Sequence, residues 1–257
     1  MVNILAIARK ELKSYFSSPI GYVLLGFWSI LFGYFYIIIL SVFLRNSMQA
    51  ASMGGPVSAN INQEMLRPLL YNVTILVLFI LPGVTMRTYS EEKRSGTIEL
   101  LLTSPITDFQ IIMGKFLGAM GLYMLMLMVT WIHVGILFFF GSPEWKPILV
   151  AYLGLVLLGG CFVAVGLFIS SLTKNQVVAF MVTFSVFLFL WVISWMTSAS
   201  WAGPTVQAVA SYLSIVDHFD DFGKGVIDTT HVLYYVSFIT FGLFLTAKSV
   251  DSERWRG

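Results

Sequence analysis

Six long apolar stretches constrain this chain more than any other feature of its sequence. The first, Ile20 to Leu44, runs for twenty-five residues without Asp, Glu, Lys or Arg, and a helix of roughly 20 apolar residues already crosses a hydrocarbon core about 30 Å thick. A soluble domain carries about 25% charged residues, whereas this chain has 11%. Because so little polar surface cannot cover a globule in water, the sequence predicts an all-α membrane protein.

The apolar stretches predict six transmembrane helices in a single domain that covers residues 1–257. The predicted spans are 20–44, 69–86, 108–140, 148–170, 177–199 and 231–248. Residues 1–19 are expected to form an amphipathic interfacial helix, because Leu5 and Leu12 share an apolar face opposite Arg9, Lys10 and Lys13.

Two connecting segments, 45–68 and 200–230, are predicted to lie outside the cell. The first is polar and shows no sustained period, which is typical of a partly ordered loop. In the second, apolar residues alternate with charged ones and indicate an interfacial helix outside the membrane. Those apolar residues are Ile215, Val216, Phe219 and Phe222.

The distribution of Lys and Arg predicts the orientation in the membrane. Six spans place both termini on one side, where eleven of the fifteen Lys and Arg residues fall, against four on the other side. Because loops rich in Lys and Arg stay in the cytoplasm, both termini and segment 87–107 are expected to be cytoplasmic.

A polar stretch from Arg87 to Gln110 separates the second and third spans. It holds seven of the chain's twenty-eight charged residues in twenty-four positions, so it must lie in water. Gly96 is expected to break a solvated helix that ends near Arg94, and Thr97 can cap a short second helix. The apolar side of this short helix would consist of Ile98, Leu101 and Leu102.

The end of the same stretch predicts where the third span begins. Ser104-Pro105 should end the short helix, because the residue before proline is disfavoured in the α conformation. Thr107 and Gln110 have the spacing of a capping box and predict the start of the next helix. The stretch therefore indicates a cytoplasmic coupling helix between two breaks, although these patterns alone also fit an ordinary cytoplasmic loop.

Residues 92–105 resemble the pattern E-x-x-x-G-T-x-E-x-L-x-x-x-P of ABC type-2 transporter permeases, the membrane subunits of ATP-driven exporters. The amphipathic N-terminus, the six spans and the segment FDDFGKGVID at 219–228 are similar to the subgroup of gliding-motility and copper-processing permeases. The resemblance implies that segment 87–107 couples the chain to an ATPase. The residues it assigns to this contact are Glu91, Glu92, Arg94, Gly96, Thr97, Ile98, Glu99, Leu101, Leu102 and Pro105.

Three groups of residues within the spans are candidates for further roles. Pro82 and Gly83 predict a kink that serves as a hinge just before the coupling segment. Gly114, Gly118 and Gly121 predict close helix contact, either within the chain or between two copies. The aromatic residues of the fifth span fit a translocation path, although a packed or lipid-facing stripe is the more usual explanation for them. The candidates for such a path are Phe180, Phe184 and Trp191.

Titratable residues suggest no metal centre and no catalytic site. His133 lies deep in the third span, where a neutral ring that is hydrogen-bonded to a neighbour is expected. Asp217, His218, Asp220 and Asp221 invite a metal hypothesis, but clustered carboxylates are common in outer loops, so we predict no metal site. The single cysteine, Cys161, is expected to pack as a small apolar residue.

The sequence also argues against an enzyme or a self-powered transporter. It lacks the G-x-x-x-x-G-K-[ST] phosphate loop, and no Asp, Glu, Lys or Arg lies near the middle of a span. We therefore expect no cofactor on this chain, with ATP and Mg²⁺ bound by the ATPase. The expected partners are that ATPase, a second permease copy or related membrane subunit, a periplasmic accessory protein and the lipid membrane, but no nucleic acid.

The leading hypothesis is thus an exporter permease of the bacterial inner membrane. An alternative is a membrane anchor or scaffold of a motility or maturation complex that binds the same ATPase without moving a solute. A passive channel receives little support from unbroken apolar spans.

Overall fold

The computed structural model describes residues 2–53, 60–99, 105–197 and 203–254, and its regular elements are helices. Six of them are long and apolar enough to cross a membrane, as the sequence predicts. They are α2 (Pro19–Ser52), α3 (Arg67–Thr85), α6 (Asp108–Phe140), α7 (Trp145–Leu172), α8 (Gln176–Thr197) and α11 (Thr229–Arg254). Shorter helices connect or flank them. These are α1 (Val2–Ser17), the π-helix η1 (Asn62–Leu66), α4 (Ser90–Ser95), α9 (Pro204–Leu213) and α10 (Asp217–Gly223).

The start of α6 follows directly from its sequence. Thr107 has extended backbone angles, its side chain accepts a hydrogen bond from the amide of Gln110, and the Gln110 side chain accepts one from the amide of Thr107. This capping box satisfies donors that the first turn leaves free. Helix α6 begins at Asp108 and ends at Phe140, the range predicted for the third span.

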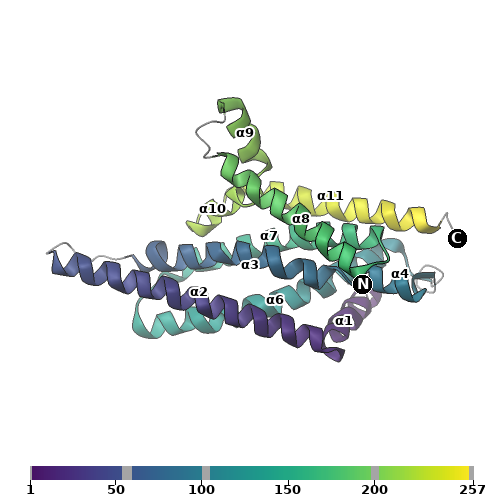
Figure 1. Cartoon of the computed structure of the whole chain (residues 1–257), viewed down its shortest axis with the longest axis horizontal. Coiled ribbons are helices and arrows are strands. Elements are labelled where there is room, and N and C mark those ends of the chain that lie inside the picture. The colour runs from purple at the N-terminus through teal and green to yellow at the C-terminus, as the bar shows by residue number, and fades with distance from the viewer. Residues whose placement is uncertain (1, 54–59, 100–104, 198–202, 255–257) are drawn as a thin grey trace.

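Helix α7 lies at the centre of the bundle and contacts α3, α6, α8, α10 and α11. Figure 1 shows α2, α3, α6, α7 and α11 running along the long axis of the molecule. Small residues of α7 permit close approach, as is usual between membrane helices. A side chain added at Gly159 would meet the ring of Tyr123 in α6, and one at Gly166 would meet Thr85 in α3.

The first span is longer than the sequence indicates. Helix α2 continues past Leu44 to Ser52, and η1 occupies part of the segment predicted as an irregular loop. The sequence predicts a loop after Leu44 because the residues that follow are polar and no longer continue the apolar run. Nevertheless, no Gly or Pro interrupts the chain between Arg45 and Met53, so the helix continues.

Helix α10 differs from the predicted surface helix. Ile215, Val216, Phe219 and Phe222 are completely buried in the core, and α10 packs against α3 and α7. Gly154 of α7 makes room for this, because a β-carbon there would lie 2.6 Å from that of Phe222. The alternation of apolar and charged residues does indicate a helix with one apolar side, but this side packs against other helices of the chain.

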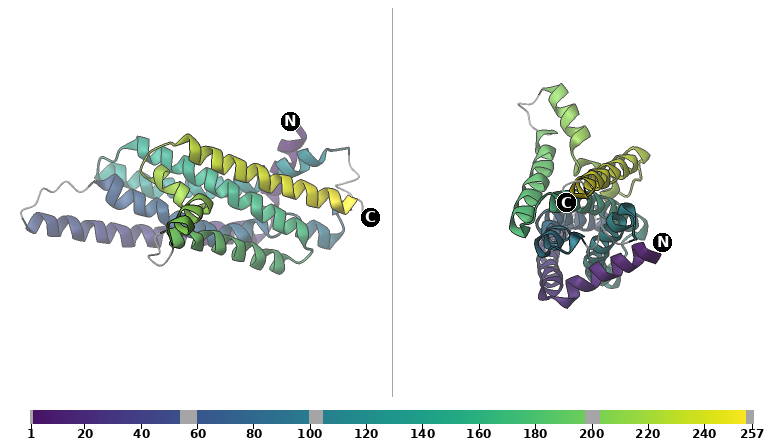
Figure 2. Two further views of the ribbon diagram at one scale, coloured as in Figure 1. Left: turned by 90° about the horizontal axis from the view of Figure 1, so that it is seen from above. Right: turned by 90° about the vertical axis from the view of Figure 1, so that its right-hand side faces the viewer.

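Helices α8 and α9 form an arm in which α8 packs against α3 and α7 and α9 extends away from the bundle. The two helices contact one another, and α9 projects away from the other helices in Figure 1 and in the right-hand view of Figure 2. Many apolar side chains of the arm are exposed, among them Phe189, Trp195 and Tyr212.

Candidate coupling site

A short turn, residues 86–89, links α3 to α4 near both termini, at an end of the bundle that we call the α4 end (Figure 1). Pro82 lies inside α3, which ends at Thr85. Two side chains from other helices hold this turn. The Tyr15 hydroxyl donates to the Val84 carbonyl at 2.9 Å, and the Ser170 hydroxyl accepts from the amides of Tyr89 and Ser90 at 3.1 and 3.2 Å. The turn is thus fixed to α1 and α7.

Helix α1 packs along the first turns of α6. A β-carbon added at Gly114 would lie 2.6 Å from that of Ile7, and one added at Gly118 would lie 2.5 Å from that of Glu11. Gly121 faces Leu12 at 3.6 Å. The predicted glycine face is therefore used within this chain by α1.

Lys115 of α6 joins α1, α4 and α6 through a buried ionic network. Its ammonium group lies 2.9 Å from a carboxylate oxygen of Glu11 and 2.9 Å from one of Glu92, and it donates to the Thr88 carbonyl at 2.7 Å. It also lies over the Tyr89 ring, 4.8 Å from the centroid. The side chain of Lys115 is only 1% exposed, so these partners replace the water that a charged group requires.

Sequence patterns alone do not predict this network. A signal was present, because a lysine two turns into an apolar helix needs acidic partners, and Glu11 and Glu92 lie in neighbouring polar segments. Their convergence on Lys115 depends on how three helices pack.

Two further ion pairs connect α4 to its surroundings. Arg87 binds both carboxylate oxygens of Glu91, at 2.8 and 3.2 Å, and donates to the Ser18 hydroxyl at 3.1 Å. Lys93, 3% exposed, pairs at 2.5 Å with Glu253 near the end of α11. Helix α4 is therefore not the fully solvated extension that its charges indicated. Through Arg87 it is linked to Ser18, at the junction of α1 and α2, and through Lys93 to the end of α11.

The residues predicted to bind an ATPase divide into three groups. Arg94, Gly96, Thr97, Glu99 and Pro105 are exposed. Glu92 and Ile98 are largely shielded, since Glu92 pairs with Lys115 and Ile98 is 8% exposed; their contacts with a partner remain a prediction. Leu101 and Leu102 lie outside the described residues. Glu91 is half-buried and binds Arg87.

A polar cleft opens between α1 and α4 beside the exposed group. It has a volume of about 290 Å³, and its walls carry both positive and negative side chains. Its lining residues are Lys10, Glu11, Ser14, Arg87, Thr88, Glu91, Glu92, Ser95 and Thr97.

Gly96 ends α4 in the left-handed region, with φ of 72°, which confirms the predicted break. A β-carbon there would meet no atom within 4 Å, so only the backbone conformation favours glycine at this position.

Gly96→Val is expected to cost about 1–2 kcal/mol locally and to displace Thr97 and the following residues. Limited proteolysis of the folded chain after Arg94 should become faster, while Gly203→Val, at an unobstructed glycine with φ of −64°, should leave this cleavage unchanged.

The remaining candidates lie inside the bundle. Phe184 of α8 contacts Phe79 of α3 and stacks with Phe180, and Trp191 contacts Trp195, so a role in a translocation path remains a prediction. His133 packs against Phe32 and Tyr36. Contrary to the expected hydrogen bond, its buried Nδ1 has no partner in the part of the chain that the structure describes.

The six apolar helices and the fixed, charged turn define a multi-pass membrane protein with a structured polar end. Residues 5–244 match the family model described as ABC-2 family transporter protein, and the chain belongs to this family. It is thus the membrane component of an ABC-2 transporter, a class of subunit that is normally not catalytic, and the family implies an ABC ATPase partner. No curated protein matches the chain.

Proposed function

We propose that this chain is the permease subunit of an ATP-driven exporter in a bacterial inner membrane, and that the ATPase binds the α4 end. The contact surface consists of the exposed residues Arg94, Gly96, Thr97, Glu99 and Pro105. Both termini and this surface face the cytoplasm, which the excess of Lys and Arg on that side supports. A second copy of the chain, or a related subunit, completes the transporter.

The observation that carries this proposal is the rigid attachment of α4. Its buried Lys93 is paired with α11, Glu92 with α6 through Lys115, and the preceding turn with α7 through Ser170. A force applied to the exposed side of α4 therefore reaches helices of the bundle through short polar contacts. A loop without such contacts would absorb the same force in its own backbone.

The inward position of Glu92 and Ile98 changes which residues carry the contact. The ATPase then contacts the exposed side chains of Arg94 and Thr97, rather than the apolar side of a short helix. The cleft beside them, between α1 and α4, offers space for a partner side chain, and both α1 and α4 would then sense nucleotide-driven movement.

Charge reversal at this surface tests the proposal. Arg94→Glu together with Thr97→Glu is expected to weaken ATPase binding about tenfold or more, equivalent to about 1.4 kcal/mol, because two negative charges enter a desolvated contact. Co-purification of the ATPase at increasing dilution measures the loss. The matched control is Lys146→Glu, an exposed residue at the start of α7, which should bind normally.

Undiminished binding by the Arg94/Thr97 variant would contradict the assignment of this surface. Transport and scaffolding are then separated in liposomes that contain the chain and its ATPase. An exporter moves a substrate that stimulates ATP hydrolysis, whereas a scaffold shows stimulation without movement.

A further inference from the structure

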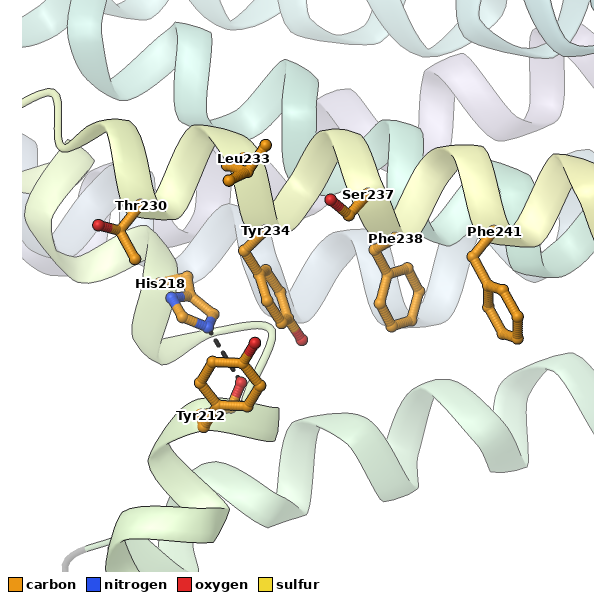
Figure 3. A pocket seen from close by; sticks show the side chains of 8 residues that line it. All are labelled: Tyr212, His218, Thr230, Leu233, Tyr234, Ser237, Phe238 and Phe241. Carbon is orange, nitrogen blue, oxygen red and sulfur yellow. Dashed lines mark hydrogen bonds between the residues drawn. The ribbon is translucent and has the colours of Figure 1, made fainter.

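Two histidines meet at the end of the bundle opposite to α4. His218 lies in α10 and His231 in the first turn of α11, and their Nδ1 atoms are 2.7 Å apart. Both side chains are largely shielded from water, and the His218 ring packs on Tyr234 with centroids 3.8 Å apart. Figure 3 shows His218 between Tyr234 and Tyr212, at the inner end of an aromatic pocket of about 330 Å³.

The outer nitrogen of each ring faces an atom that can only accept a hydrogen bond. His218 Nε2 lies 3.2 Å from the Tyr212 carbonyl oxygen, and His231 Nε2 lies 2.9 Å from a carboxylate oxygen of Asp221. A carbonyl and an ionised carboxylate have no proton to donate. Each Nε2 therefore carries a hydrogen, and these two hydrogens alone would make both rings neutral.

The contact between the two Nδ1 atoms then fixes the number of protons. Two neutral rings would direct one lone pair at another across 2.7 Å, whereas two doubly protonated rings would direct two N–H groups and two positive charges at each other. One additional proton forms an Nδ1–H···Nδ1 hydrogen bond. We infer that His218 and His231 share a single extra proton and that this imidazole–imidazolium pair fastens the α8–α9 arm to α11.

The surroundings of the pair affect two of its groups. Burial lowers the pKa of His218, although its hydrogen bond to Tyr212 acts in the opposite direction. Hydrogen bonds from Lys224 and then His231 lower the pKa of Asp221. The Asp221 carboxylate therefore stays ionised and remains the acceptor for His231 Nε2.

Other ionisable groups face the pair from each element packed around it. They are Tyr212 of α9, Asp217, Asp220 and Asp221 of α10, Lys224 and Asp228 in the following turn, Tyr234 and Tyr235 of α11, Arg67 of α3 and Cys161 of α7. Arg67 and Lys224 pair with Asp220, at 2.6 and 2.7 Å. Lys224 also pairs with Asp221 at 2.9 Å, so the Asp221 carboxylate binds both Lys224 and His231.

A bridging metal ion explains the geometry less well. Two nitrogens that bind one zinc tetrahedrally at about 2.0–2.1 Å lie about 3.3 Å apart, which is longer than the observed 2.7 Å. Moreover, no group of three or more His, Cys, Asp or Glu suited to a metal occurs among the described residues.

The pair controls how the arm joins the bundle. His218 binds the carbonyl of Tyr212, near the end of α9. Directly after this residue, the hydroxyls of Tyr234 and Tyr235 in α11 donate hydrogen bonds to the carbonyls of Leu213 and Ile215, at 3.0 and 2.8 Å. A second extra proton would break the bond between the rings. Because the pKa of His218 is lowered by folding, protonation below its ordinary pKa of about 6.5 favours the open arrangement, so acid should release the arm.

Nitrogen NMR of the full-length chain in lipid nanodiscs, with ¹⁵N-labelled histidine, tests this inference. At neutral pH we expect one neutral and one protonated ring, joined by a strongly deshielded proton that disappears in His218→Gln and is unaffected by a chelator. His133→Gln is the matched control and should retain the signal. Two neutral rings at neutral pH, or a signal that changes on chelation, would overturn the inference.

Hydrogen exchange of the segment from Tyr212 to Phe219 provides a second readout, corrected for the intrinsic pH dependence of exchange. Protection should fall by about tenfold between pH 7 and pH 5 in the wild-type chain and in His133→Gln. In His218→Gln it should be low at both pH values. Tyr234→Phe should loosen the same segment but keep the deshielded proton. Protection that is independent of pH in the wild-type chain would also refute the proposed role.

Discussion

Lys115→Met is expected to lower the free energy of unfolding by about 3–5 kcal/mol, because it leaves two acidic side chains in a protein interior without their common partner. Glu11 and Glu92 are only 12% and 15% exposed, and each lies 2.9 Å from the lysine ammonium. The carbonyl of Thr88 would also lose its donor. Urea unfolding of the detergent-solubilised chain, followed by tryptophan fluorescence, measures the loss.

The origin of this effect can be separated from packing. Lys115→Met combined with Glu11→Gln and Glu92→Gln removes the uncompensated charges, and we expect it to recover most of the lost stability. Lys224→Met is the control at the opposite end, where the side chain is 44% exposed and an exposed ion pair contributes about 1 kcal/mol or less. Equal losses in the single and triple variants would show that the charges are not responsible.

Gly118→Leu is expected to detach α1 from α6 and to lower the free energy of unfolding by about 3 kcal/mol or more, at the upper end of the range for overpacked sites. The new β-carbon would lie 2.5 Å from that of Glu11 and 3.2 Å from the Ala8 carbonyl. These are atoms at or near the backbone of α1, so the helix itself must move. Movement of Glu11 would also weaken its pair with Lys115.

The chain contains a matched control for this substitution in the same helix. Gly135 has no atom within 4 Å of the position of an added β-carbon, and Gly135→Leu should be neutral or slightly stabilising, because leucine has a helix propensity about 0.8–1 kcal/mol better than glycine. Cysteine cross-linking of Asn3 to Gln110, whose exposed side chains hydrogen-bond across α1 and α6 at 3.2 Å, reports the position of α1 directly. Efficient cross-linking in Gly118→Leu would show that α1 stays in place.

Local sequence signals were sufficient to predict most of the fold. The apolar runs predict six spans, Thr107 and Gln110 predict the start of α6, and Gly96 predicts a break that the left-handed backbone confirms. These signals succeed because a membrane requires long apolar helices, and because helix ends depend on hydrogen bonds within a few residues.

The sequence predicts which segment forms the candidate site, but not which of its side chains are exposed to a partner. Charge content and the resemblance to known permeases indicate residues 87–107 as the coupling segment, and they assign Glu92 and Ile98 to the contact with a partner. In the structure, however, Glu92 pairs with Lys115 of the same chain, and Ile98 is buried. The same limit applies to Phe219 and Phe222, since an alternating pattern has the same appearance against lipid and against protein.

The sequence by itself determined that this protein has six segments long and apolar enough to cross a membrane, and that a polar segment follows α3. Only the tertiary structure decided the partners of the buried groups: Glu11 and Glu92 at Lys115, α1 on the glycines of α6, and His218 beside His231. The physical reason is distance along the chain. Apolar length and helix caps act over neighbouring residues, whereas a buried charge is stabilised by groups that only the packing of separate helices brings together.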